Sequence, residues 1–300
     1  MDVHSLDLMI EYSYPLYRPP AEADNIIIQA TYGCSYNNCT FCSMYKTKSF
    51  EVRDIEDVFR DVDTLAKLYP DARKIFLADG DALALDTNYL LKLLSYLKQS
   101  FVKLGRVSLY ASAQNILNKS SQELEELKEN GLNLIYYGVE TGSDTVLKKI
   151  TKGVNQSEII ESLNKASDAG LKISATVILG MGGIKYSDEH IKESAKIINE
   201  TKVNYLSTLQ LGLEEESKEK FYKHFSDFEM LSDTELLQEQ KKFLELLNPT
   251  NKIIFRSNHA SNALHLGGNL PREKDRLVQE LEDAINVGEM AFVPRMFRGF

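Results

Sequence analysis

The sequence is poor in basic residues and contains no long apolar segment. Its 300 residues include 35 lysines and arginines against 44 acids, which gives a formal net charge of −9. This balance lacks the positive footprint that attracts nucleic acid or an anionic membrane. The longer apolar runs, such as residues 175–183, fall well short of the roughly 20 residues that a membrane-spanning helix needs. The sequence therefore predicts a globular protein that binds no membrane and for which nucleic acid is not the favoured partner.

Cysteine is scarce as well. The chain has three cysteines, an odd number, and all of them lie in one short stretch. The first residues, Met1–His4, lack the basic and then apolar pattern of a secretory signal. Both observations argue against a disulfide framework. We expect a cytoplasmic protein with reduced thiols.

The spacing of Cys34, Cys39 and Cys42 is C-x4-C-x2-C. Three thiolates on one loop can bind three irons of a cubane iron–sulfur cluster, which normally takes four cysteines, so the fourth iron would stay open. A zinc site is the alternative, and such sites usually combine two cysteine pairs or closely spaced cysteine and histidine. No histidine lies between His4 and His190, which argues against a local zinc module.

Short apolar runs alternate with helical patterns in the first two thirds of the chain. The runs that we interpret as strands are residues 25–30, 74–78, 106–111, 134–139, 172–179 and 205–211. Strands that alternate with helices at this spacing predict an α/β protein with a parallel sheet, because parallel strands need crossover connections.

The two ends of the chain differ from this pattern. Residues 1–24 are irregular and rich in tyrosine and proline, and residues 213–300 contain a charged run, two helical patterns and an apolar segment at 252–255. No low-complexity linker divides the chain. We expect one domain, with a core at 25–212, an N-terminal extension at 1–24 and a C-terminal helical extension at 213–300 that covers or lines a substrate cavity.

Chemistry-bearing residues follow several predicted strands directly. In parallel α/β folds, functional residues gather on the loops after the carboxyl ends of strands, so we expect these loops on one rim. The loops are the cysteine stretch, Asp79-Gly80-Asp81, Glu140-Thr141-Gly142 and Gly180-Met181-Gly182-Gly183. Taken singly, the glycines fit tight turns, and the acids fit turns or helix caps.

Together these stretches resemble the radical S-adenosylmethionine (SAM) enzymes, in the branch of the oxygen-independent coproporphyrinogen oxidases. The cysteine loop with Phe41 resembles their cluster motif, the segment around Glu140 their SAM-contacting strand, and residues 177–183 the strand beside adenine. The match covers about residues 25–210. It implies a partial parallel (β/α)6 barrel of the TIM type with N- and C-terminal extensions. Two departures are one extra residue between Cys34 and Cys39, and Asp-Gly-Asp where the family has Gly-Gly-Glu.

The resemblance also implies cofactors and a reaction. Cys34, Cys39 and Cys42 would hold a [4Fe–4S] cluster whose open iron binds SAM. Reductive cleavage of SAM, driven by an external electron donor such as flavodoxin or ferredoxin, would give methionine and a 5′-deoxyadenosyl radical that abstracts hydrogen from a substrate. The residues expected to contact SAM are Phe41, Gly80, Asp81, Glu140, Gly180 and Gly182.

The substrate is less defined. Arg256 and His259 follow the apolar segment at 252–255 and are candidate catalytic residues, because arginine binds carboxylate or phosphate and histidine exchanges protons near neutral pH. A structural role is the alternative for the histidine. With no further cysteine for a second cluster, sulfur insertion and methylthiolation are not favoured. We expect hydrogen abstraction from a small molecule; the alternatives are a non-catalytic iron–sulfur or redox protein, or a SAM- or heme-binding protein of the same fold.

Overall fold

The computed structural model describes residues 10–299 of the chain, which form two compact units. Within the described residues, the first unit comprises 10–37, 44–136 and 168–172, and the second unit comprises 38–43, 137–167 and 173–299. The expected division into a core at 25–212 with extensions at 1–24 and 213–300 follows the chain in order and does not correspond to these units. It stays a prediction.

The first unit contains the strands β1 (Ile26–Gln29), β4 (Lys74–Ala78), β5 (Arg106–Ala111) and the beginning of β6 (Leu132–Glu140), in that order in its sheet. Neighbours β1, β4 and β5 run parallel. A separate antiparallel ribbon joins β2 (Thr31–Tyr32) to β3 (Glu51–Val52). The helices of this unit are α1 (Ile55–Leu68), α2 (Thr87–Ser100), α3 (Ala113–Leu117) and α4 (Ser121–Glu129).

Helix α1 shows why these sequences form helices. The Asp54 side chain accepts a hydrogen bond from the Glu56 N–H and so caps the first turn. Val58, Val62 and Leu65 recur at helical spacing and are buried, which gives the helix one apolar face. The helix contacts β1 and α2. Its apolar face therefore contributes to the core of the first unit.

The second unit contains the end of β6 followed by β7 (Lys172–Leu179), β8 (Tyr205–Gln210), β9 (Ile253–Ser257) and β10 (Leu266–Leu270), again in chain order. Strands β7, β8 and β9 run parallel, and β10 pairs antiparallel with β9. The helices are α5 (Asp144–Lys149), α6 (Gln156–Asp168), α7 (Gly183–Glu200), α8 (Glu215–His224), α9 (Asp233–Leu246) and α10 (Lys274–Val287).

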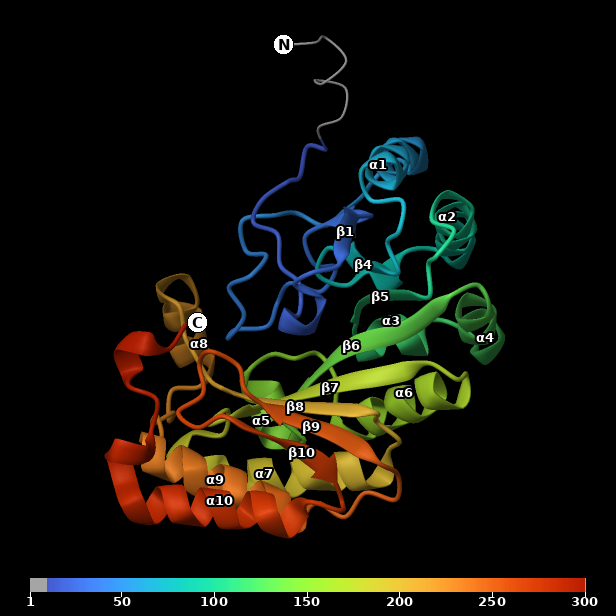
Figure 1. The fold of residues 1–300 in the computed structure, drawn as a ribbon. Coiled ribbons are helices and arrows are strands. Elements are labelled where there is room, and N and C mark those ends of the chain that lie inside the picture. Colours follow the sequence, from blue (N-terminus) through green and yellow to red (C-terminus); the bar gives the residue numbers. More distant parts are fainter. Residues whose placement is uncertain (1–9, 300) are drawn as a thin grey trace. The chain divides into compact units, whose positions relative to one another are not determined.

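Helices cover one face of β8, β9 and β10. In Figure 1, α7, α9 and α10 lie side by side along these strands, and α9 contacts both of the others. Gln240 of α9 donates hydrogen bonds to the hydroxyls of Thr208 on β8 (3.2 Å) and Ser257 on β9 (2.7 Å). A Cβ atom at Gly268 of β10 would meet Leu277 of α10. Because strand side chains alternate, the intervening residues point to the opposite, open face.

The predicted fold class, a mostly parallel α/β sheet with helices, is confirmed, and the sheet is open. All six predicted strands are present as β1, β4, β5, β6, β7 and β8. The apolar segment at 252–255 is the beginning of β9. Strand β10 was not predicted, because its sequence, Leu-Gly-Gly-Asn-Leu, carries two glycines, which are rare in strands.

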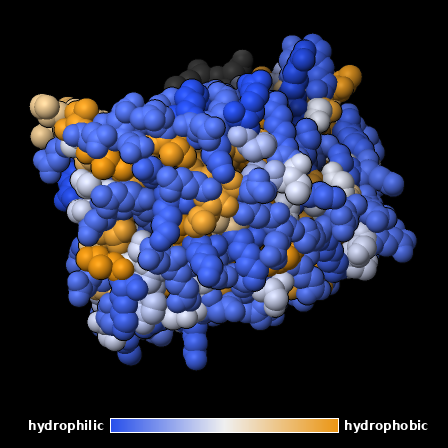
Figure 2. Space-filling view, turned by 90° about the horizontal axis from the view of Figure 1, so that it is seen from below, coloured by the Kyte–Doolittle hydropathy of each residue, from blue (hydrophilic) through white to orange (hydrophobic). Residues whose placement is uncertain are grey.

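The surface is mostly hydrophilic, as the charged composition predicts. Figure 2 shows a face dominated by hydrophilic residues, on which apolar residues form small groups. No helix within residues 10–299 is long and apolar enough to cross a membrane.

Candidate functional site

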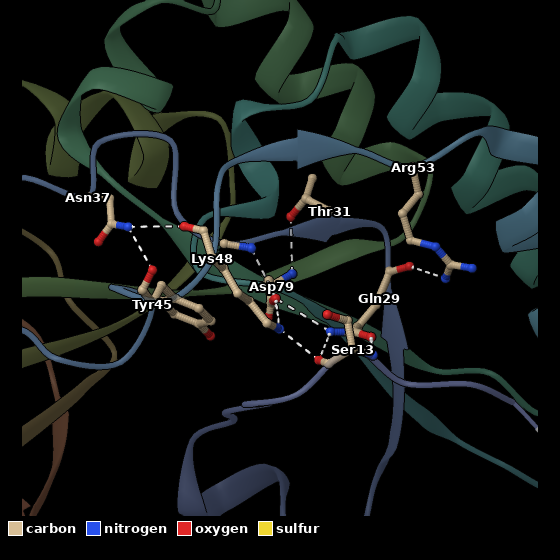
Figure 3. Close-up of polar contacts among 9 residues, drawn as sticks. Ser13, Gln29, Thr31, Asn37, Tyr45, Lys48, Arg53 and Asp79 are labelled. Carbon is tan, nitrogen blue, oxygen red and sulfur yellow. Dashed lines mark hydrogen bonds and ion pairs between the residues drawn. The ribbon is translucent and has the colours of Figure 1, made fainter.

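In the first unit, Asp79 fixes the beginning of the cysteine loop. This buried carboxylate, just after β4, accepts hydrogen bonds from the Gly33 N–H (3.1 Å) and from Gln29 Nε2 (3.4 Å), and it pairs with Lys48 at 2.9 Å. The Asp79 N–H donates to the Thr31 hydroxyl. Figure 3 shows Gln29, Thr31 and Lys48 around Asp79. Burial raises the pKa of Asp79, while Lys48 and the Gly33 N–H oppose the rise.

Gly80 and Asp81 hold the loop beside Cys34. A Cβ atom at Gly80 would lie 2.8 Å from the Cβ of Cys34 and 2.8 Å from the Tyr45 ring, so a larger residue would displace the cysteine. Asp81 accepts hydrogen bonds from the Ser35 N–H (2.9 Å) and from the Ser35 hydroxyl. Burial raises the pKa of Asp81. Its carboxylate is thus already engaged by the loop, and its expected contact with SAM stays a prediction.

In the second unit, Glu140 and Lys152 form an ion pair. Their charged atoms are 3.0 Å apart, and their side chains are only 12% and 17% exposed. Glu140 adopts a left-handed backbone conformation, with φ of 61°. A Cβ atom at Gly138 would come within 1.9 Å of the Glu140 carboxylate, so glycine at this position makes room for the carboxylate.

Lys152 also lies close to the cysteine loop. Its ammonium nitrogen is 6.0 Å from the centre of the Phe41 ring. Burial lowers the pKa of Lys152, but the negative charges of Glu140 and Cys39 outweigh burial and hold the pKa above its usual value. Lys152 belongs to the segment whose sequence resembles the family's SAM-contacting strand, but it was not among the predicted site residues, because one sequence does not show that this lysine is buried beside acids.

Residues 38–43 dock onto the end of α5 and onto α8. The Thr40 N–H donates to the Ile150 carbonyl (3.0 Å), and the Asn38 carbonyl accepts from the Thr151 hydroxyl (2.7 Å) and from Lys220 of α8 (3.1 Å). These bonds fix the segment that carries Cys39 and Cys42. All three cysteines of the loop are half-buried. No preformed group of three or more His, Cys, Asp or Glu side chains for a metal ion is found in residues 10–299.

Gly180 and Gly182 form a tight turn between β7 and α7. Gly180 has φ of 80°, which favours glycine, and a Cβ atom there would lie 2.8 Å from the Leu236 side chain. A Cβ atom at Gly182 would lie 2.7 Å from the Tyr186 carbonyl oxygen. The turn is therefore closely packed in this unit, and the expected contact of both glycines with SAM stays a prediction.

A buried polar network links this turn to the end of β6. Glu239 of α9 accepts from the Gly180 N–H (2.5 Å) and from the Ser187 hydroxyl. His190 of α7 lies 2.7 Å from the Thr141 hydroxyl through Nδ1 and 3.9 Å from Glu239 through Nε2. Burial raises the pKa of Glu239 to about 7 and lowers the pKa of His190 to about 4. No sequence pattern marks Glu239, which lies in an ordinary amphipathic helix 59 residues after Gly180 in the sequence.

Replacing Glu239 with glutamine is expected to change how stability depends on pH. Folding raises the pKa of Glu239 from 4.5 to about 7, so the folded protein keeps a proton that the unfolded chain releases. The contribution of Glu239 is therefore fully present below pH 4.5 and is lost as the pH rises to about 7, by up to about 3 kcal/mol. Urea unfolding at pH 5, 6, 7 and 8 measures the difference between wild type and Glu239→Gln.

His190 contributes to the pH dependence of stability with the opposite sign, and both proteins keep this histidine. Its contribution therefore cancels in the difference between the unfolding free energies of wild type and variant. Glu245→Gln, an exposed acid of the same helix with a side chain that is 49% exposed, is the matched control and should give a difference independent of pH. A difference for Glu239→Gln that stays constant from pH 5 to pH 8 would contradict the prediction.

Arg256 and His259 lie at the end of β9. Arg256 is exposed, and its Nη1 donates to the Phe255 carbonyl (2.7 Å). His259 is half-buried in the following loop, with Nδ1 2.8 Å from the Ser261 hydroxyl, and burial lowers its pKa. Asn262 bonds the Thr208 carbonyl (2.9 Å) and so ties the loop to β8. Both candidates therefore lie near the carboxyl edge of parallel strands; their roles in catalysis stay predictions.

Comparisons with curated proteins give partial matches. The chain is 27% identical over 160 residues to a putative methylthiotransferase of Methanocaldococcus jannaschii, which covers 52% of this chain and 35% of that protein. It is 30% identical over 124 residues to the heme chaperone HemW of Bacillus subtilis, which covers 41% of this chain and 33% of HemW. The chain thus spans about a third of the length of these relatives.

Solved structures share the fold. Methylornithine synthase (PylB) has a TM-score of 0.54 at 16% identity, with 76% of this chain and 63% of PylB covered. Coproporphyrinogen III oxidase (HemN) from Escherichia coli has a TM-score of 0.53 at 16% identity, with 74% and 52% covered. Residues 28–198 match the family model of the radical SAM superfamily. Since this match covers more than half of the chain, the protein belongs to the radical SAM superfamily.

Proposed function

We propose that this protein binds one [4Fe–4S] cluster through Cys34, Cys39 and Cys42, and cleaves SAM to abstract hydrogen from a small molecule. The observation that carries the proposal is that all three cysteines lie on one loop after β1, and each is half-buried. Thiolates are the ligands that iron–sulfur clusters prefer. The donor set therefore fits a cluster with one iron open to SAM.

The residues around the loop have the chemistry to hold SAM. When bound, the reduced cluster supplies the electron that splits SAM into methionine and a 5′-deoxyadenosyl radical. The Lys152 ammonium would attract the carboxylate of the methionine part, and Glu140 would accept hydrogen bonds from the SAM ammonium or ribose. Asp81 would orient the loop and face the ammonium. Phe41, Gly180 and Gly182 would shape the site and exclude water.

A single cluster limits the reactions that we propose. Although one relative is named a putative methylthiotransferase, these 300 residues hold no cysteine beyond the three of the loop, so they offer no thiolates for a second cluster. Hydrogen abstraction with one cluster and one SAM is the reaction that we favour. An electron donor such as flavodoxin or ferredoxin would reduce the cluster, with Arg256 and His259 facing the substrate.

Anaerobic reconstitution with iron and sulfide, followed by SAM and dithionite, tests the proposal. We expect 5′-deoxyadenosine to form with the reductant and not without it. An intact cluster that yields no 5′-deoxyadenosine would refute the enzymatic function. The similarity to HemW supports heme binding without turnover as a second candidate, which predicts retention of added heme and a heme absorbance band instead.

A further inference from the structure

We propose that the open face of the sheet in the second unit binds the carboxylate of the substrate through Thr176, Ser207 and Arg256. This inference rests on the proposed function, because it names the class of substrate for that reaction: a small carboxylic acid with an aliphatic portion. The three residues come from three different strands, and no sequence motif joins them.

The strand register brings these residues into one row. Thr176 of β7 pairs with Ser207 of β8, and Ser207 pairs with Arg256 of β9. On the far side, Arg256 pairs with Gly267 of β10. Neighbouring strands lie about 4.8 Å apart, so two hydroxyls and a guanidinium follow one another across the sheet. The two hydroxyls are thus neighbours, and the long side chain of Arg256 follows them in the row.

The row lies on the face that the helices leave open. Helix α9 reaches Thr208 and Ser257, each adjacent in sequence to a member of the row, and α10 packs against Gly268. Side chains of successive strand residues alternate between faces. Accordingly Thr176 and Ser207 are half-buried and Arg256 is exposed. A ligand therefore has access to this row.

Arg256 is chemically free to bind an anion. Within residues 10–299 Arg256 forms no ion pair with a carboxylate, although the chain has nine more acids than bases. Only Nη1 is engaged, by the Phe255 carbonyl. A Cβ atom at Gly267 would lie 3.3 Å from Nη1, so the guanidinium lies over Gly267, where a larger residue would crowd it. A guanidinium fork matches a carboxylate in geometry, and one cation balances the single charge of a carboxylate better than the charge of a phosphate dianion.

An apolar surface adjoins the row. Two residues further along the strands, Ile178 pairs with Leu209, about 7 Å from the row at the usual rise of a strand. Ile178 belongs to a buried apolar cluster, against which Leu209 and Phe41 pack. Phe41 directly precedes Cys42. A carboxylic acid held at the row would thus extend its carbon chain along apolar side chains toward the segment that carries Cys39 and Cys42.

Calorimetric titration of the anaerobically reconstituted protein tests this inference with three probes: hexanoate, its neutral counterpart hexanamide, and inorganic phosphate. We expect hexanoate to bind about tenfold more tightly than hexanamide, since an arginine–carboxylate contact supplies on the order of that factor. Arg256→Ala should remove this preference, and Arg256→Lys should keep part of it. Arg272→Ala, which removes an exposed arginine with a side chain that is 80% exposed, should behave as wild type.

Circular dichroism and cluster absorbance show whether Arg256→Ala folds; if it does not, Ser207→Ala and Thr176→Val provide the test, with an expected two- to fivefold weakening for hexanoate alone. Equal binding of hexanoate by wild type and the folded variants, tighter binding of phosphate than hexanoate, or no binding by wild type would overturn the inference. Formation of 5′-deoxyadenosine by wild type is scored separately, so failure of the proposed function is distinguishable from failure of this substrate class.

Discussion

Replacing Cys39 with alanine is expected to abolish both the iron–sulfur cluster and the formation of 5′-deoxyadenosine. The loop has three thiols and the sequence holds no other, so no cysteine can substitute. Without Cys39, only two irons of the cluster would have a thiolate ligand, and two irons would have none. Such a cluster would not be retained. We expect 5′-deoxyadenosine to fall by more than about 100-fold, since loss of a direct ligand exceeds the effect of its supporting contacts.

Absorbance near 400 nm, together with iron and sulfide analysis after anaerobic reconstitution, measures the loss. Ser43→Ala changes the residue after Cys42 and keeps all three thiols, so it should retain the cluster and serves as the control. Because Thr40 and Asn38 anchor this segment through backbone atoms, the Cys39 substitution should leave the fold of the second unit intact. Wild-type absorbance in Cys39→Ala would rule out Cys39 as a ligand.

The strands of this fold were predictable because each one is marked by a short apolar run within its own residues. A run such as Ile26-Ile27-Ile28 has few alternatives to a buried strand. The charged residues at 214–220 are exposed, as a solvated face requires, but the run also begins α8, which buries Ser217 and Phe221. A charged helix with a single buried edge gives a weak periodic signal, so its packing was not predictable from the sequence.

Some residues of the candidate site were also predictable from the sequence, and others were not. The cysteines, Gly80 and Glu140 were identifiable because spacing and neighbours within a few residues mark them. Their partners were not identifiable. Lys48 reaches Asp79 from the other side of the cysteine loop, and Glu239 reaches Gly180 from a helix of the C-terminal part. Such pairs depend on tertiary structure, and one sequence does not report which distant residues meet.

The largest effect expected from such a partner is that of Lys152→Met, which removes the ammonium and keeps most of the side-chain volume. Glu140 would then be left largely buried without its cation, and breaking a buried pair from one side costs about 3 kcal/mol. We also expect 5′-deoxyadenosine formation to fall by about 100-fold, because a cation beside Cys39 and Glu140 would no longer balance the charge of the SAM carboxylate. Urea unfolding and the anaerobic assay measure the two effects.

Two further variants separate these effects. Lys149→Met, on the preceding helix, removes an ion pair with Asp227. The side chains of Lys149 and Asp227 are 23% and 33% exposed, so this variant should lose no more than about 1 kcal/mol of stability and should cleave SAM normally. The double variant Glu140→Gln/Lys152→Met leaves no unpaired charge, so it should regain most of the stability while SAM cleavage stays low. If Lys152→Met matched Lys149→Met in both measurements, the ion pair would have neither role. If the double variant regained cleavage together with stability, Lys152 would act on the fold alone, because a direct contact with SAM cannot be restored by removing its partner's charge.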